Sequence, residues 1–157
     1  MARRVLIALG VCIAAAVVEG LCSGTQVQER FDALRLPAGS LPLSGWIVIG
    51  LFYYAMCFVI VFRVLRHPPD APYRRAALLL LLALMAANAG WNLLFFRTDH
   101  LLLALLSFIP YVAIAVGLLL ALWRIDRPAA SVVVPYALYL VYVTTWTYRL
   151  WQLNPAT

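Results

Sequence analysis

The chain has 157 residues, of which 66% are hydrophobic and only 11% are charged. Soluble domains are about 45–50% apolar, so this composition, with a mean hydropathy of +0.94, indicates an integral membrane protein. Each helical span uses about 20 residues plus a connection, which limits the chain to about five or six spans and leaves no room for a separate soluble catalytic domain. The net charge is +6, but the basic residues are all arginines at the ends of apolar runs, where they meet lipid headgroups. Nucleic acid is therefore not expected as a partner.

Five runs with few or no charges are each long enough to cross a bilayer as a helix. Backbone groups in lipid must be hydrogen-bonded within the segment, and the runs lack the alternation of barrel strands. The sequence therefore predicts an all-α integral membrane protein, a five-transmembrane-helix bundle forming a single domain over 1–157. The predicted spans are about 5–23, 43–62, 76–96, 101–123 and 128–148. The segment 24–42 contains Pro37, Gly39 and Pro42 and is predicted to be a loop.

The first apolar run follows Arg3 and Arg4 and therefore also resembles a secretory signal. No small-x-small cleavage site follows it cleanly, so we expect it to be retained as a helix. It contains Glu19, and an ionisable group in a membrane helix usually faces a partner or a wet cavity. Three alternatives stay open for this residue: snorkelling to the interface, pairing with an arginine such as Arg35, or a functional role.

Aromatic and amide side chains occur together inside the third and fifth predicted spans. Trp91 lies near Asn88 and Asn92 in the third, and Tyr139 lies near Thr144 in the fifth. An apolar cavity with a few hydrogen-bonding groups is what a flat hydrophobic ligand requires. The alternative is that the amides hydrogen-bond neighbouring helices together and the rings fill space between them.

The third span also carries small residues at four-residue spacing. Such pairs let two helix backbones approach closely in lipid, although alanine-rich helices also contain them by chance. They predict a homodimer seam formed by Ala83, Ala86, Ala87 and Gly90.

Arginines at alternate span ends predict the orientation in the membrane. Eight lie on the side of the N-terminus and four on the other side, and the side richer in basic residues faces the cytoplasm. We therefore expect an integral protein of the bacterial inner membrane with its N-terminus in the cytoplasm. The eight are Arg3, Arg4, Arg63, Arg66, Arg74, Arg75, Arg124 and Arg127, and the four are Arg30, Arg35, Arg97 and Arg149.

The usual sequence patterns of catalysis and metal binding are missing. His67 and His100 both lie in predicted loops, and no serine occurs in a G-x-S-x-G setting. Cys12, Cys22 and Cys57 show no paired spacing. We therefore predict no catalytic residue, no metal site and no obligatory cofactor.

Several segments resemble the TspO/MBR family, whose members include the tryptophan-rich sensory proteins and the mitochondrial translocator protein. The third span reads NAGWNLLFF over 88–96, which is similar to the family's N-x-x-W-x-x-x-F-F. The run RFDALRLP over 30–37, followed by Pro42, resembles the family's W-Y-x-x-L-x-K-P-x-W-x-P-P loop. The run PYALY over 135–139 resembles its P-Y-x-x-W, and Tyr54 stands where the family has a tyrosine in the second span.

The resemblance covers nearly the whole chain and implies a bundle, usually dimeric, that binds porphyrins, sterols and related flat hydrophobic molecules between its helices, under a lid formed by the first loop. Porphyrin or haem is then the expected ligand, with a sterol-like or isoprenoid molecule as the related possibility and membrane lipids as neighbours. Arg30 or Arg35 would pair with the ligand's carboxylates, which suit arginine. The ligand-contacting residues that the resemblance implies are Phe31, Pro42, Tyr54, Asn88, Trp91, Tyr139 and Val143.

The second span departs from the family pattern at Gly50, where the family has a tryptophan. That tryptophan is linked to light-driven porphyrin breakdown in some members. Trp46 lies one turn earlier on the same helix face, so we expect it to refill part of the space and to contact the ligand. The lid departs as well, since 38–41 lacks the family's tryptophans and its first proline.

The leading hypothesis is a membrane receptor or carrier for a tetrapyrrole, with a regulatory or transport role. One alternative is an enzyme that modifies a porphyrin or a lipid, which Gly50 and the lack of a metal cluster disfavour. The other is an assembly or regulatory subunit of a membrane complex, in which side chains would fill the pocket.

Overall fold

The computed structural model describes residues 1–98 and 100–155, and every regular element in this part of the chain is a helix. Five helical segments are long and apolar enough to cross a membrane, so the prediction of an all-α five-helix membrane bundle is confirmed. The fourth spanning segment consists of two consecutive helices, and a further short helix lies between the first and second spanning segments. The elements are α1 (Ala2–Ser23), α2 (Val27–Ala33), α3 (Leu43–Val64), α4 (Arg74–Arg97), α5 (Leu101–Leu106), α6 (Phe108–Ile125) and α7 (Arg127–Leu153).

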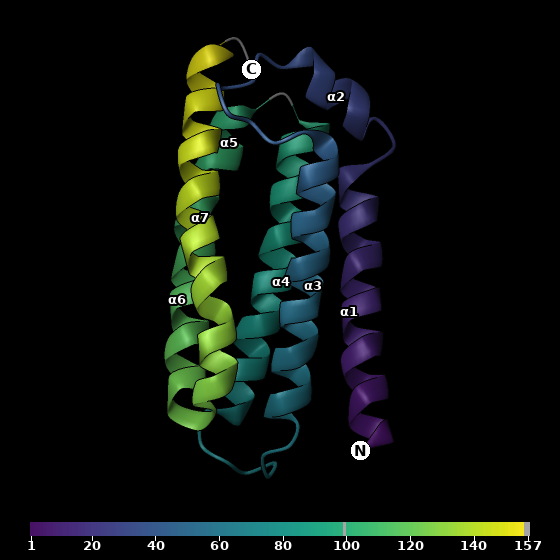
Figure 1. Cartoon of the computed structure of the whole chain (residues 1–157), viewed down its shortest axis with the longest axis vertical. Coiled ribbons are helices and arrows are strands. Elements are labelled where there is room, and N and C mark those ends of the chain that lie inside the picture. Colours follow the sequence, from purple (N-terminus) through teal and green to yellow (C-terminus); the bar gives the residue numbers. More distant parts are fainter. Residues whose placement is uncertain (99, 156–157) are drawn as a thin grey trace.

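The spanning helices form a closed ring in the order α1, α4, α6, α7 and α3, each packed on the next, with α3 returning to α1. Figure 1 shows α2 and the C-terminal end of α7 at one end of the bundle, here called the lid end. The N-terminus, the α3–α4 loop and the α6–α7 turn lie at the opposite end. Segments far apart in the sequence, such as α1 and α4, therefore lie side by side.

Several helices run past the predicted span ends, because arginines favour helix and continue it beyond the apolar run. α3 ends at Val64, α4 begins at Arg74, and α7 ends at Leu153. The fourth span is interrupted at Ser107, whose hydroxyl donates to the Ala104 carbonyl at 2.7 Å. Pro110 has no N–H to continue the hydrogen-bond ladder there.

The loop predicted over 24–42 contains the helix α2. Its apolar side points inward, since Phe31 and Leu34 just beyond it are buried, while Gln28 and Asp32 on its outer side are exposed and hydrogen-bonded to each other at 2.8 Å. The chain turns into α2 at Gly24, whose φ of 76° is a left-handed conformation that glycine adopts without strain. The first loop is therefore a folded lid rather than an irregular strap.

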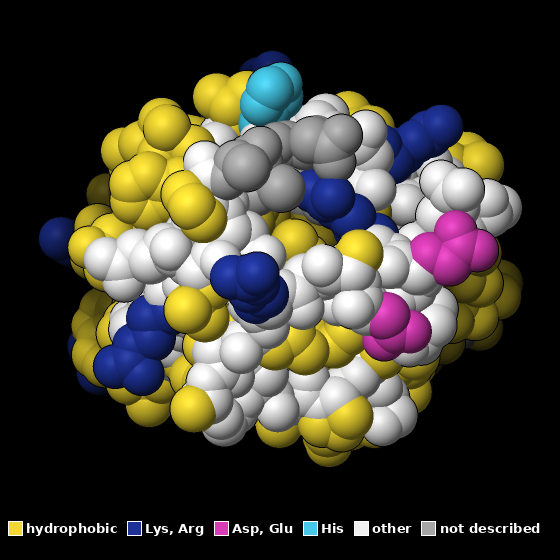
Figure 2. All heavy atoms as spheres, turned by 90° about the horizontal axis from the view of Figure 1, so that it is seen from above, with side chains coloured by type: hydrophobic (Ala, Val, Ile, Leu, Met, Phe, Trp, Pro, Cys, Tyr) yellow, Lys and Arg dark blue, Asp and Glu magenta, His cyan; other side chains and the backbone are white. Residues whose placement is uncertain are grey.

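Large apolar side chains such as Leu6, Phe52 and Leu138 are largely exposed around the outside of the bundle. Seen from the lid end (Figure 2), charged side chains of both signs lie on the end face and apolar side chains make up much of its rim. This distribution is that of an integral membrane protein, with lipid replacing water around the sides.

At the opposite end of the bundle, Asp126 connects the start of α7 with the end of α3 and the loop after it. Its carboxylate accepts from the backbone N–H of Ala129 at 2.9 Å, capping α7, and forms an ion pair with Arg63 of α3 at 2.9 Å. The His67 Nε2 atom lies 3.1 Å from the same carboxylate. Burial alone would raise the pKa of Asp126, but the hydrogen bonds from Ala129, Arg63 and His67 outweigh it, and the pKa is lowered from its ordinary value.

Candidate ligand pocket

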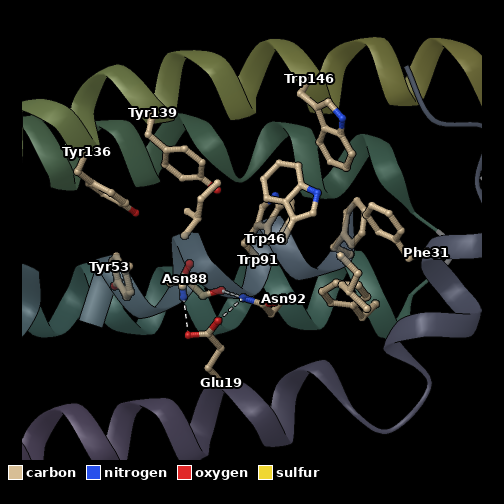
Figure 3. Close-up of a pocket in the computed structure, with 15 residues that line it drawn as sticks. Glu19, Phe31, Trp46, Tyr53, Asn88, Trp91, Asn92, Tyr136, Tyr139 and Trp146 are labelled. Carbon is tan, nitrogen blue, oxygen red and sulfur yellow. Dashed lines mark hydrogen bonds between the residues drawn. The ribbon is translucent and has the colours of Figure 1, made fainter. Parts of the chain in front are cut away.

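A cavity of about 110 Å³ lies between α1, α3, α4 and α7 toward the lid end, and Phe31 of α2 closes it from above. We call it the inner pocket (Figure 3). Most of its wall is aromatic, and its polar groups come from α1 and α4. The aromatic side chains of the wall are Phe31, Trp46, Tyr53, Trp91, Phe95, Phe96, Tyr136, Tyr139 and Trp146.

Two tryptophans connect the aromatic wall to the lid. The ring of Trp46 lies 4.8 Å from that of Trp146, measured between centroids. The indole N–H of Trp146 donates to the Ser40 hydroxyl at 2.8 Å, and that of Trp46 donates to the Leu41 carbonyl at 3.2 Å. Because both partners belong to the segment between α2 and α3, two rings of the wall are hydrogen-bonded to the backbone or side chains of the lid segment.

The second aromatic group of the wall is on α4. Trp91 stacks on Phe95 with centroids 4.8 Å apart and an interplanar angle of 17°. Among the described residues, the buried indole N–H of Trp91 has no hydrogen-bond partner. Buried donors are normally paired, so this wall offers an unused donor.

Glu19 is the acidic group of the inner pocket. The Tyr54 hydroxyl donates to its Oε2 atom at 2.5 Å and the Asn88 amide donates to the same atom at 2.7 Å. The Asn92 amide donates to Oε1 at 3.2 Å, as Figure 3 shows for the two asparagines. Of the three alternatives for Glu19, pairing with Arg35 is not seen, because Arg35 lies exposed at the lid end, where its backbone N–H donates to the side chain of Asn154.

The hydrogen bonds around Glu19 extend to every spanning segment of the bundle. The Ser23 hydroxyl donates to the side-chain Oδ1 atom of Asn92 at 3.2 Å. On the other side the Tyr111 hydroxyl of α6 donates to Asn88 at 3.1 Å and lies 2.5 Å from the Tyr136 hydroxyl of α7. One polar network therefore runs from α1 through α3 and α4 to α6 and α7.

The structure brings together five of the residues predicted to contact a ligand. The other three lie elsewhere: Tyr54 is behind Glu19, Val143 is buried in the core, and Pro42 is exposed at the start of α3. Those that line the inner pocket are Phe31, Trp46, Asn88, Trp91 and Tyr139.

The two arginines proposed to meet ligand carboxylates are separated. Arg30 lines a polar hollow of about 430 Å³ at the lid end together with Arg97. Phe96 lines both this hollow and the inner pocket, so the two spaces are neighbours. Arg35 does not line either of them.

Sequence reasoning named Asn92 only as a neighbour of Trp91, and it did not assign to the site the wall residues Leu43, Ile49, Tyr53, Phe95, Phe96, Tyr136 and Trp146. Helical spacing indicates several of them. On α3, positions 46, 50 and 53 share one face, and on α7 positions 136, 139 and 146 do so. Trp146 therefore shares the face of Tyr139.

Gly50 lines the inner pocket, and a Cβ atom added there would meet no atom within 4 Å. Trp46 lies in the wall one turn away and leaves this space open. The absence of the family's tryptophan is therefore not compensated at position 50 itself.

A second, apolar space opens between α3 and α7 beside the inner pocket. It has a volume of about 460 Å³ and is here called the side groove. Ile49, Tyr53, Tyr136 and Tyr139 line both spaces, so these four side chains are the partition between them. Within residues 1–98 and 100–155, no group of three or more potential metal ligands is assembled.

The fold and this site define a class: an integral membrane protein with five spanning helical segments, a small, mostly aromatic pocket between them and a folded lid above it. The model of the TspO/MBR family matches residues 8–152. The chain therefore belongs to the TspO/MBR family. No curated protein matches it. Family membership supports, in general terms, a membrane receptor or transporter that binds sterols or tetrapyrroles.

Proposed function

We propose that this protein is a membrane receptor or carrier that binds a tetrapyrrole, such as protoporphyrin IX or haem, with a regulatory or transport role. The observation that carries the proposal is the convergence of aromatic side chains from the lid and three spanning helices on one cavity that also holds hydrogen-bonding groups. Flat aromatic ligands gain from stacking on such rings, and a few polar groups fix their orientation.

The size of the ligand requires the partition to move. Pockets for ligands of drug size have volumes of about 300–1,000 Å³, whereas the inner pocket has about 110 Å³ and the side groove about 460 Å³. We infer that the macrocycle occupies both spaces after the Tyr139 ring turns out of the partition. The apolar side groove suits the vinyl and methyl edge of a porphyrin.

The propionates of a tetrapyrrole need cationic partners near the membrane surface. Arg30 and Arg97 line the polar hollow next to Phe96, and arginine pairs well with carboxylates. This arrangement favours Arg30 over Arg35 as the propionate partner and adds Arg97.

Titration of the purified protein in a neutral detergent with protoporphyrin IX, and separately with haem, tests the proposal through quenching of tryptophan fluorescence. We expect saturable binding that is lost in an Asn88→Ala, Trp91→Phe double variant and kept in Tyr148→Phe, which alters an exposed ring. Quenching that rises linearly without saturation, in a protein shown to be folded by circular dichroism, would rule out this pocket as a tetrapyrrole site.

The proposal includes an inner-membrane location with the opposite end of the bundle in the cytoplasm. The N-terminus, the α3–α4 loop and the α6–α7 turn lie at that end and carry most of the arginines. Alkaline phosphatase fused after α7 should then be active in the periplasm, and an inactive fusion would reverse the assignment.

The proposal also includes a homodimer through α4. Ala86 is exposed on its outer side, and Ala83, Ala87 and Gly90 are half-buried beside it. A bulky side chain at the seam should prevent close approach of two helices. Ala86→Trp is expected to convert cross-linkable dimers to monomers, whereas Leu120→Trp on the exposed side of α6 is not; equal cross-linking of both variants would place any dimer contact elsewhere.

A further inference from the structure

The two oxygens of the Glu19 carboxylate are unequally occupied. Oε2 accepts from both Tyr54 and Asn88, at 2.5 and 2.7 Å, whereas Oε1 accepts only from Asn92, at 3.2 Å. A carboxylate oxygen can accept about two hydrogen bonds. Glu19 lines the inner pocket, so Oε1 has acceptor capacity left beside the cavity.

The three donors to Glu19 are all neutral groups. The ion pairs between described residues join Asp126 to Arg63 and His67 at the opposite end, and no described arginine or histidine pairs with Glu19. Negative charge within a membrane span is costly unless a partner or water compensates it. The charge of Glu19 is thus met by hydrogen bonds but by no described cation.

The wall around Glu19 is suited to a cation. Trp46, Trp91, Tyr139 and Trp146 come from three helices and line the same cavity as Glu19; in Figure 3, Asn88 and Asn92 lie between Glu19 and the rings of Trp46, Tyr139 and Trp146. The faces of tryptophan and tyrosine rings attract ammonium groups, and aromatic cages bind them in many proteins. A carboxylate combined with aromatic faces favours an ammonium head over a neutral or anionic one.

We propose that Glu19 makes the inner pocket selective for flat hydrophobic molecules that carry a protonated amine. The ammonium group donates to Oε1 of Glu19 at the polar side of the inner pocket, and the hydrophobic body extends along the aromatic wall and past the partition into the side groove. This inference rests on the proposed function only in that a flat hydrophobic molecule enters the pocket. For a tetrapyrrole it directs the propionates away from Glu19, toward Arg30 and Arg97.

Three pyrene probes of similar shape test the selectivity: pyrenemethylamine, pyrenemethanol and pyrenecarboxylic acid. Binding is measured as energy transfer from tryptophan to pyrene in neutral dodecyl maltoside micelles, with empty micelles as the partition control. We expect the amine to bind the wild-type protein about ten-fold more tightly than the alcohol, which corresponds to about 1.4 kcal/mol. The acid is expected to bind most weakly.

Glu19→Gln removes the charge and keeps the size of the side chain. It should lower the affinity for the amine about ten-fold and change that for the alcohol by less than about two-fold. The matched control is Asp32→Asn, which removes an exposed carboxylate from α2 outside the inner pocket and should leave the ranking of the probes unchanged.

Equal affinities of the amine and the alcohol for the wild-type protein would overturn the inference, and this comparison stands even if Glu19→Gln fails to fold by circular dichroism. An amine preference that survives in a folded Glu19→Gln variant would overturn it as well. Protoporphyrin IX is titrated in parallel. If protoporphyrin binds saturably but the amine is not preferred among the pyrenes, only this inference is contradicted. If neither protoporphyrin nor any of the three pyrenes binds saturably, the proposed function is contradicted as well.

Discussion

Gly50 leaves open space on the wall of the inner pocket. It lies in the interior of α3, where glycine is less favourable than alanine by about 0.5–1 kcal/mol. A Cβ atom there would meet nothing within 4 Å, and the same holds for Gly10 in α1. A methyl group can therefore be added at either glycine without a clash, but only Gly50 borders the pocket.

Replacing either glycine by alanine should stabilise the protein, because it restricts the unfolded chain without a clash. We expect Gly50→Ala and Gly10→Ala each to raise the free energy of unfolding by about 0.5–1 kcal/mol, measured by thermal melting in detergent. Only Gly50→Ala should also change the affinity for a pocket ligand. Destabilisation by Gly50→Ala would show that the space at position 50 is not free in solution.

At the scale of elements, α7 is held at both ends. Asp126 caps its first turn and pairs with Arg63 of α3. Beyond its last turn, the side chain of Asn154 forms two hydrogen bonds with the backbone of Arg35. Its Oδ1 atom accepts from the Arg35 N–H at 3.0 Å, and its amide nitrogen donates to the Arg35 carbonyl at 3.1 Å. One helix thus connects the C-terminal end of α3 with the lid, although the 27 residues of α7, Arg127–Leu153, separate the two contacts.

The lowered pKa of Asp126 predicts a loss of stability in acid. A carboxyl group whose pKa is depressed on folding stabilises the folded state at pH values above its unfolded pKa, and that contribution disappears as the pH falls through the folded pKa. Asp126→Ala should cost about 3 kcal/mol near neutral pH, through loss of the cap and the ion pair. The gap in melting temperature between wild type and variant should narrow below about pH 4; a gap that is constant across that range would contradict the role given to the charge.

The elements could be predicted from the sequence where apolar runs are long. About 20 apolar residues determine a span regardless of its neighbours, which is why each long apolar run of the described chain contains a helix, although α3, α4 and α7 extend beyond their predicted ends. The seven residues of α2 are too few for a periodic signal, and its burial depends on the bundle beneath it. These helices were predicted too short, because they continue through the arginines that follow or precede the apolar runs.

The pocket could be predicted only in part, for a reason of geometry. Spans that are apolar on all sides do not encode how far each helix is rotated about its axis, and that rotation decides which side chains meet. Asn88 and Trp91 were found because they place an amide and an indole close together inside one apolar span, and the family motif marks the same two positions. The contact of Glu19 with Tyr54 joins positions on α1 and α3 that no local pattern relates.

At the scale of the whole molecule, the polar network around Glu19 links the five spanning segments. Interhelical hydrogen bonds in membranes contribute about 0.6 kcal/mol each on average, and up to about 1.7 kcal/mol. Tyr111 is a junction of this network, because its hydroxyl contacts both Asn88 and Tyr136. The loss of one hydroxyl there should affect helices on both sides of it.

Tyr111→Phe keeps the ring and removes the junction. We expect the free energy of unfolding to fall by about 1 kcal/mol and ligand affinity to fall as well, since Asn88 loses one of the partners that fix its amide. The control is Tyr142→Phe, an exposed tyrosine on α7, which should change neither. Equal effects of the two substitutions would mean that the network does not hold the helices together.

The network has a thermodynamic consequence for finding the natural ligand. Its members from α1, α4 and α7 also form the pocket wall, so a molecule bound there is bound to the folded bundle and not to separated helices. By mass action, such a molecule raises the free energy of unfolding by about 2.7 kcal/mol at a concentration one hundred times its Kd, and the melting temperature rises with it. Unlabelled metabolites can therefore be ranked by melting temperature alone, with Glu19→Gln and Asp32→Asn run side by side to identify those that bind through the carboxylate.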